Sequence, residues 1–227
     1  PVETEIVRHE HQCNPDLAPH YSEPPPEYWA LWKQECALAD GILVNSAWSK
    51  QALQQVGIPA QKLHVVPLAY EPEAQRHSPP QRTYPGQFSH QRPLRVLFLG
   101  QVILRKGIAA LIAAAERLTH SPVEFWVVGG IGIEPPALPN VKWIGPVARS
   151  QVAEYYQKAD IFLFPTLSDG FGLTQLEAQY WQLPLIASGN CGEVIEQGIN
   201  GLVLPEVSGE AIMNALITCL REPDLLR

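Results

Sequence analysis

Residues 94–128 read LRVLFLGQVILRKGIAALIAAAERLTHSPVEFWVV. Two short runs at its ends, 94–99 and 123–128, are rich in Leu, Val and Phe and predict buried strands. Apolar side chains recur at helical spacing between them, on a face formed by Ile108, Leu111, Ile112, Ala115 and Leu118. A strand, a helix and a second strand in this order form a βαβ unit, so the stretch predicts two parallel strands of one sheet.

The same alternation continues to the end of the chain. It predicts strands at 141–144, 161–164, 185–187 and 202–204, and helices at 150–158, 173–181 and 209–220. Parallel strands joined by helices indicate an α/β fold with an open, doubly wound, Rossmann-like sheet over residues 94–227. Ligands bind beyond the carboxyl ends of such strands, so the loops after Leu99, Val128 and Phe164 are the candidate site.

The sequence before this unit has a different character. Residues 1–26 are polar and rich in His and Pro, which predicts loop and short helix only. An amphipathic helix at 27–39, a strand at 41–44, a helix at 47–56 with a cap at Asn45-Ser46, and a buried strand at 63–68 follow. Residues 69–93 are rich in proline and hold little that could pack, so we interpret them as a linker.

Composition excludes several classes of protein. The 227 residues are 46% hydrophobic and 17% charged, which is typical of a globular protein. A formal net charge of -7 without a basic run argues against a nucleic-acid-binding protein. No apolar stretch approaches the ~20 residues of a membrane-spanning helix. The scattered cysteines, Cys13, Cys36, Cys191 and Cys219, have neither zinc-ligand nor disulfide-framework spacing, so we expect no metal site and a cytoplasmic location.

The loop after Leu99 places two cations just before a helix. Arg105 and Lys106 precede Gly107, where the predicted helix begins. A helix N-terminus carries unpaired N–H groups and a partial positive charge, and two full charges beside it suit a diphosphate. A pair of solvated surface cations is the alternative for such a sequence taken alone.

The loop after Val128, Gly129-Gly130-Ile131-Gly132, is rich in glycine but is not a dinucleotide-binding fingerprint. That motif needs a third glycine at position 135, where this chain has Pro135. Gly129 would let a nucleotide approach the end of the strand, because it has no side chain. A plain turn is an equally good interpretation.

The loop after Phe164 carries the strongest pattern. Residues 165–178 read PTLSDGFGLTQLEA and lead into a helix. Gly170 and Gly172 allow consecutive backbone N–H groups to converge on a phosphate. Asp169 outside the helix and Glu177 about two turns within it are suited to accept hydrogen bonds from sugar hydroxyls. The alternative is that Asp169 caps the helix and that Glu177 is paired with a cation.

The run from Asp169 to Glu177 resembles the EGFGLxxxE motif of family-4 retaining glycosyltransferases of the GT-B fold, the glycosyl transferases group 1. Residues 100–107 resemble their GRLxxxKG segment, residues 140–145 their NVxFxG segment, and residues 183–188 their GLPVIAS segment. Residues 39–46 and 65–67 resemble the end of their N-terminal domain. The resemblance therefore implies that residues 1–68 are the remnant of an acceptor-side Rossmann-like domain and that residues 94–227 bind a nucleotide sugar. We also expect the chain to be a fragment of a longer protein, since it begins at Pro1 rather than Met.

The resemblance also implies roles for the residues that match the motifs. It assigns the diphosphate to Lys106, the hydroxyls of the donor sugar to Asp169 and the ribose hydroxyls to Glu177. Further donor contacts fall on Gln101, Arg105, Gly129, Gly170, Phe171, Gly172 and Leu173, the last four through backbone groups at the helix end. Two positions depart from the family pattern, which has Glu at Asp169 and Arg at Gln101, so the identity of the donor sugar is open.

The expected reaction is transfer of a sugar from a UDP-, GDP- or ADP-sugar with retention of configuration, without a metal or another cofactor. A preorganised cation and N–H dipoles can stabilise the leaving diphosphate. The acceptor would be a carbohydrate, a lipid or another hydroxyl compound, no nucleic acid is expected as a partner, and the parent protein could contact a membrane peripherally. We expect the fragment alone to be inactive. The alternatives are a degenerate domain that only binds nucleotide sugar, and another GT-B enzyme such as a sugar-nucleotide epimerase.

Overall fold

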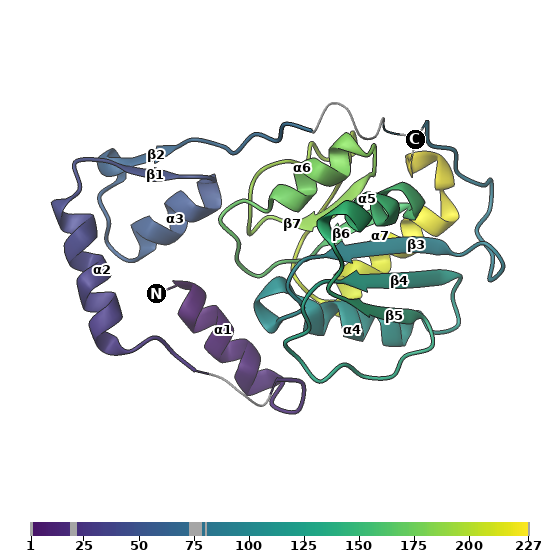
Figure 1. The fold of residues 1–227 in the computed structure, drawn as a ribbon, viewed down its shortest axis with the longest axis horizontal. Helices are drawn as coiled ribbons and strands as arrows, with labels where there is room; N and C mark the ends of the chain where they lie inside the picture. Colours follow the sequence, from purple (N-terminus) through teal and green to yellow (C-terminus); the bar gives the residue numbers. More distant parts are fainter. Residues whose placement is uncertain (1, 19–21, 73–78, 80, 227) are drawn as a thin grey trace.

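The computed structural model describes residues 2–18, 22–72, 79 and 81–226, and a six-stranded sheet dominates it (Figure 1). The order of this sheet is β5-β4-β3-β6-β7-β8, and every neighbouring pair is parallel. Its strands are β3 (Leu94–Leu99), β4 (Val123–Val128), β5 (Val141–Gly145), β6 (Ile161–Phe164), β7 (Leu185–Ser188) and β8 (Gly201–Leu204). The predicted α/β fold with a doubly wound parallel sheet is confirmed.

Helices cover both faces of the sheet, and each face has its own apolar cluster. One cluster packs beneath α4 (Ile108–Arg117) and α7 (Gly209–Arg221), and the other beneath α5 (Arg149–Lys158) and α6 (Leu173–Tyr180). Val96 and Phe98 of β3 belong to the first cluster and Leu97 to the second, as alternation along a strand requires. Burial on both sides is why these strands appear in the sequence as nearly continuous apolar runs.

The chain order reverses between β3 and β6. From β3 the chain proceeds through β4 to β5 on one side, and from β6 through β7 to β8 on the other. The connections that leave the carboxyl ends of β3 and β6 therefore diverge, and a crevice opens between them. The short helix η2 (Leu104–Lys106) lies in the first of these connections.

A buried carboxylate connects β6 to β3 at the amino ends of these strands, away from the crevice. Asp160, only 3% exposed, accepts hydrogen bonds from the Arg92 guanidinium at 2.6 and 2.7 Å and from the backbone N–H of Arg95 at 2.9 Å. Because a buried charge is tolerated only when it is paired and hydrogen-bonded, this arrangement favours the register in which Val96 pairs with Ile161.

A smaller unit precedes the main sheet. It contains α1 (Val2–Cys13), α2 (Pro26–Leu38), β1 (Ile42–Val44), α3 (Ala47–Gln55), η1 (Ala60–Lys62) and β2 (Leu63–Val65), and η3 (Pro223–Leu226) lies at the far end of the chain. β1 and β2 form a parallel pair, and the Ser46 hydroxyl caps α3 by accepting the Ser49 N–H at 3.1 Å. The predicted cap of this helix is therefore confirmed at Ser46.

The prediction of a buried strand over 63–68 is wrong beyond its first residue. Leu63 is buried, but β2 ends at Val65, and Val66 and Leu68 are exposed. A two-stranded sheet with a helix on one side offers little to pack against. For the same reason α2 has no buried side chain, and its Trp29 and Trp32 rings meet each other edge to face at 6.0 Å.

The prediction of loop and short helix only for residues 1–26 is also wrong, because α1 has 12 residues. Glu3 and Glu5 lie in its first turn and His11 in its last, a charge distribution that complements the helix dipole. None of its side chains is fully buried, although Ile6 and Val7 are half-buried, so no apolar run in the sequence marked this helix. Figure 1 shows α1 running alongside the main domain, where it contacts η2.

The predicted linker, 69–93, packs more closely than its composition suggested. Tyr84 and Phe88 are buried against the first apolar cluster. Arg82 donates hydrogen bonds to the carbonyl oxygens of Tyr156, Ala159 and Trp181 at 2.6, 2.6 and 2.7 Å, where α5 and α6 end. The expectation that little here packs is therefore wrong for the second half of the segment, while residues 73–78 and 80 lie outside the described part. Within the described ranges, we find no helix whose length and apolar character would let it cross a membrane.

Candidate functional site

The loop after β3 and the loop after β6, which border the crevice, contact each other through their backbones. Gly107 follows η2 with φ +74°, and a β-carbon there would lie 1.8 Å from the carbonyl oxygen of Pro165. Across the same contact the Leu167 N–H donates to the carbonyl oxygen of Arg105 at 2.9 Å. Only glycine permits this approach, and it fixes the position of the preceding residue, Lys106, relative to the loop after β6.

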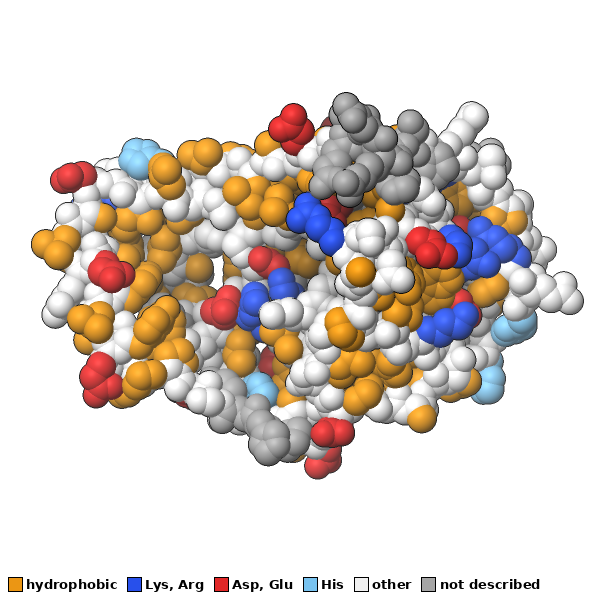
Figure 2. Space-filling view, in the orientation of Figure 1, with side chains coloured by type: hydrophobic (Ala, Val, Ile, Leu, Met, Phe, Trp, Pro, Cys, Tyr) orange, Lys and Arg blue, Asp and Glu red, His pale blue; other side chains and the backbone are white. Residues whose placement is uncertain are grey.

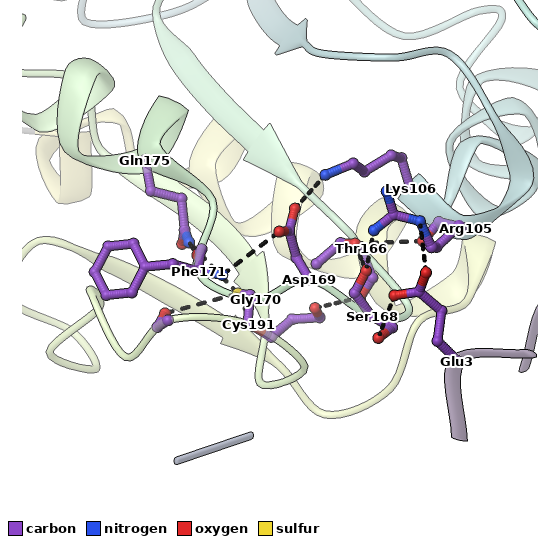
Figure 3. A network of polar contacts seen from close by, with 12 residues as sticks. Glu3, Arg105, Lys106, Thr166, Ser168, Asp169, Gly170, Phe171, Gln175 and Cys191 are labelled. Carbon is purple, nitrogen blue, oxygen red and sulfur yellow. Dashed lines mark hydrogen bonds and ion pairs between the residues drawn. The ribbon is translucent and has the colours of Figure 1, made fainter. Parts of the chain in front are cut away.

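Lys106 and Arg105 point to different partners. The Lys106 ammonium forms an ion pair with the Asp169 carboxylate (Figure 3). It also lies 5.3 Å from the centre of the Phe164 ring. Arg105 donates to the carbonyl oxygen of Ser168 at 2.8 Å, and its Nε lies 3.6 Å from the carboxylate of Glu3 in α1. Of the two predicted diphosphate ligands, Lys106 therefore faces the space between the loops after β3 and β6, and Arg105 connects the loop after β3 to α1.

A cavity of about 330 Å³ lies between the two loops. Its lining includes the predicted residues Lys106, Asp169, Gly170, Phe171, Gly172 and Leu173, and also Asn45, Gly100 and Thr174. Figure 2 shows acidic and basic side chains side by side at the middle of this face, between the N-terminal elements and the main domain. The ion pair is largely shielded there, since the Lys106 and Asp169 side chains are 13% and 16% exposed.

The N-terminus of α6 opens into this cavity. Gly172 occupies the cap position with φ +85°, and a β-carbon on it would lie 2.6 Å from the Phe164 ring. No side chain caps the helix. Within its first turn the Gln175 N–H donates to the carbonyl oxygen of Gly172 at 3.0 Å, which leaves the N–H groups of Leu173 and Thr174 without an intrahelical acceptor. Asp169 is not the cap that the alternative required, because its Oδ1 lies 3.5 Å from the Phe171 nitrogen and its other oxygen contacts Lys106.

Glu177 faces a second cavity, of about 520 Å³, which is also lined by Thr174 and Tyr180 of α6. The cavity also borders Leu99 and Thr174, as the first one does, so the two lie next to each other. The Tyr156 hydroxyl donates to Oε2 of Glu177 at 2.9 Å. Among the described residues no Lys, Arg or His forms an ion pair with Glu177, so the alternative of a cation-paired carboxylate is wrong for this part of the chain.

Besides Arg105, two predicted residues line neither of these cavities. Gln101 is exposed and lines neither of them. Gly129, at φ +139°, abuts Gly100, and a β-carbon on it would lie 1.8 Å from that residue's carbonyl oxygen. Its lack of a side chain is thus already accounted for by packing between the loops after β3 and β4.

Tyr156 is a residue of the site that the sequence interpretation did not identify, and it contacts a predicted one. Its spacing from Val152 and Ala159 places it on the buried face of α5, which is a sufficient reason for an aromatic residue there. Nothing in that spacing indicates that the hydroxyl reaches α6. Burial, followed by the nearby negative charge of Glu177, raises the pKa of Tyr156 well above its ordinary value, so the hydroxyl stays a hydrogen-bond donor.

In the part of the chain that the structure describes, no group of three or more His, Cys, Asp and Glu side chains could hold a metal ion. The prediction of a reaction without a metal stays a prediction.

Curated relatives of this chain include several glycosyltransferases. It is 26% identical over 219 residues to a D-inositol 3-phosphate glycosyltransferase of Xylanimonas cellulosilytica, covering 84% of this chain and 51% of the relative. It is 25% identical over 193 residues to the amylovoran biosynthesis glycosyltransferase AmsK of Erwinia amylovora, covering 77% of this chain and 46% of the relative. The chain thus spans about half the length of the curated relatives it matches.

Solved structures share the fold at lower identity. A sucrose-phosphate synthase of Thermosynechococcus elongatus superposes with a TM-score of 0.69 at 20% identity, over 99% of this chain and 59% of that one. HepE of Anabaena, in complex with UDP and glucose, gives 0.64 at 20% identity, over 89% and 61%. Both support the GT-B fold. Residues 93–222 match the sequence model of the glycosyl transferases group 1, more than half of the chain. The chain belongs to the family of glycosyl transferases group 1.

Proposed function

We propose that this chain carries the nucleotide-sugar-binding half of a retaining glycosyltransferase. The observation that carries the proposal is the arrangement around α6: Lys106 and the open helix N-terminus lie at one end, and Glu177 lies about one turn along, on a neighbouring cavity. A diphosphate at the helix end would leave its nucleoside beside Glu177 and its sugar beside Asp169.

The first cavity has the chemistry of a diphosphate site. The helix N-terminus offers N–H groups and a partial positive charge, and Lys106 adds a full charge. In the resting site that charge is neutralised by Asp169. Binding of a diphosphate would replace Asp169 as the partner of Lys106 and release its carboxylate to accept a hydrogen bond from a sugar hydroxyl.

The second cavity has the chemistry of a nucleoside site. Glu177 presents a carboxylate that no described cation neutralises, and vicinal ribose hydroxyls are donors that suit it. Tyr70, Val147 and Tyr180 are among the other residues that line this cavity and give it apolar surface for a base. The HepE complexes with UDP and with UDP-glucose make a UDP-sugar the first donor to test, with GDP- and ADP-sugars beside it.

The proposed reaction breaks the bond between the anomeric carbon and the diphosphate oxygen, and forms a bond from that carbon to an acceptor hydroxyl oxygen. The proton of that hydroxyl passes to the leaving diphosphate. Negative charge develops on the leaving diphosphate while the sugar becomes oxocarbenium-like. Lys106 and the N–H groups of α6 are preorganised to stabilise that charge, each donor contributing about 3 kcal/mol, so the reaction needs no metal. Retention of configuration and a hydroxyl acceptor bound by the acceptor-side domain are part of the proposal.

Calorimetric titration with UDP, GDP and ADP tests the donor site. We expect one of the three to bind the wild-type chain and to bind Glu177→Ala much more weakly. Glu116→Ala is the matched control, because Glu116 is an exposed carboxylate on α4, on the opposite face of the sheet. The proposal is overturned if none of the three binds at millimolar concentration, or if the two variants bind alike.

A second candidate is a domain that binds nucleotide sugar without transferring the sugar. The observation in its favour is Gln101, which is uncharged, exposed and away from both cavities. Release of free sugar from the donor by the full-length protein distinguishes the two. A protein that binds the donor and never cleaves it would be a binding domain.

A further inference from the structure

A side chain of the neighbouring helix α5 donates a hydrogen bond to Glu177. Its Oε2 accepts a hydrogen bond from the Tyr156 hydroxyl of α5 at 2.9 Å. Its second oxygen has no hydrogen-bond donor among the residues that the structure describes, and the side chain borders the cavity of about 520 Å³. One oxygen is therefore occupied by the protein and the other is available to a ligand.

Tyr156 is a rigid donor. The side chain is 1% exposed, and its ring packs at 5.9 Å from the ring of Phe162 in β6. The hydroxyl also lies 3.3 Å from the carbonyl oxygen of Thr174, but it has a single proton and the charged carboxylate is both nearer and the stronger acceptor. A buried ring in a close-packed core fixes its hydroxyl far better than an exposed side chain could.

We propose that Tyr156 is a positioning residue, whose hydroxyl fixes one oxygen of Glu177 so that the other faces the ribose hydroxyls of the nucleotide. This inference rests on the proposed function. It follows that Tyr156 affects nucleotide binding only when the ribose hydroxyls are present, because it acts through Glu177 and Glu177 contacts those hydroxyls. A purely structural tyrosine would affect binding of a nucleotide whether or not the ribose hydroxyls were present.

The test compares a ribonucleotide with its dideoxy form. UDP, GDP or ADP, whichever binds the wild-type chain, is titrated calorimetrically beside the corresponding 2′,3′-dideoxynucleoside diphosphate. Tyr156→Phe keeps the ring and removes only the hydroxyl. We expect this change to weaken binding of the ribonucleotide by about tenfold, the value of one hydrogen bond to a charged group. Binding of the dideoxy form should change by less than about twofold, since its ribose cannot report the orientation of Glu177.

Two controls isolate the contact. Tyr155→Phe removes a neighbouring hydroxyl whose ring packs edge to face on Trp126 at 6.3 Å, and it should leave both affinities unchanged. In a Glu177→Ala background, Tyr156→Phe should cause no further loss, because the residue through which it acts is gone. Far-UV circular dichroism melts verify that each variant is folded at the temperature of titration.

The outcomes separate the two proposals. If Tyr156→Phe weakens both nucleotides equally, or neither, Tyr156 does not position Glu177, although the nucleotide site stands. If the wild-type chain binds the ribonucleotide and its dideoxy form equally well, Glu177 does not contact the ribose. The nucleoside part of the proposed function then fails, and this inference fails with it.

Discussion

Replacing Gly107 by alanine should damage both the fold and the site, and the structure sets the size of the effect. At φ +74° any residue with a β-carbon costs about 1 kcal/mol or more. The added carbon would also lie 1.8 Å from the backbone oxygen of Pro165, which cannot turn away as a side chain would. Overpacking of this kind costs about 1–3 kcal/mol, so we expect Gly107→Ala to reduce the free energy of unfolding by about 2–4 kcal/mol.

Gly198→Ala is the matched control. Gly198 has nearly the same backbone angle, φ +78°, but a β-carbon there meets nothing within 4 Å. It should therefore cost only the conformational part, about 1 kcal/mol. The remaining difference of about 1–3 kcal/mol corresponds to a gap of about 2–12 °C between the two melting temperatures. Thermal denaturation followed by circular dichroism measures it, and equal melting temperatures would refute the assignment of Gly107 to a backbone contact.

Two further predictions concern the side chains of the site. Lys106→Ala should weaken binding of a nucleoside diphosphate by about 10- to 100-fold, the loss expected for a hydrogen bond to a charged group, and weaken the matching monophosphate less, which competitive titration of the two nucleotides measures. Thiol alkylation of the native chain at pH 8, read by peptide mass, should modify exposed Cys13 and spare Cys191, because burial raises the pKa of Cys191 to about 12 and so suppresses its thiolate; early alkylation of Cys191 would contradict its buried position.

The main sheet was predictable because its signals are local. Strands buried on both faces are apolar along their whole length, and helix α4 shows its buried face as a regular spacing. The loop after β6 could also be interpreted from the sequence, because two glycines at the start of a helix, Gly170 and Gly172, are typical of a backbone that binds a phosphate. What the sequence indicated there was the chemistry of the backbone, which depends little on distant parts of the chain.

The rest depends on partners that are far apart in sequence. The Tyr156 hydroxyl of α5 contacts Glu177 of α6, and Arg105 contacts Glu3, from which it is separated in the sequence by the rest of the N-terminal unit. Helix periodicity reports which side of a helix is buried but not what its polar end contacts. The exposure of β2 was missed for a related reason: an apolar strand in the sequence does not reveal how many layers cover it.

Glycines at the carboxyl ends of the strands are local features of the sequence that also make contacts with distant parts of the chain. Gly107 fits against Pro165, and Gly129 fits against Gly100, so backbone contacts join the loops after β3, β4 and β6, in addition to the side-chain contacts of Arg105 and Lys106 with the loop after β6. The glycine contacts use no side chains, and Lys106 and Asp169, which pair with each other, line the cavity. A site that must be held within fractions of an ångström benefits from supports that cannot change rotamer. Gly129, which the sequence interpretation gave as a ligand-approach position, therefore supports the site by packing against the loop after β3, and we expect Lys106 and Asp169 to be the side chains that meet the ligand.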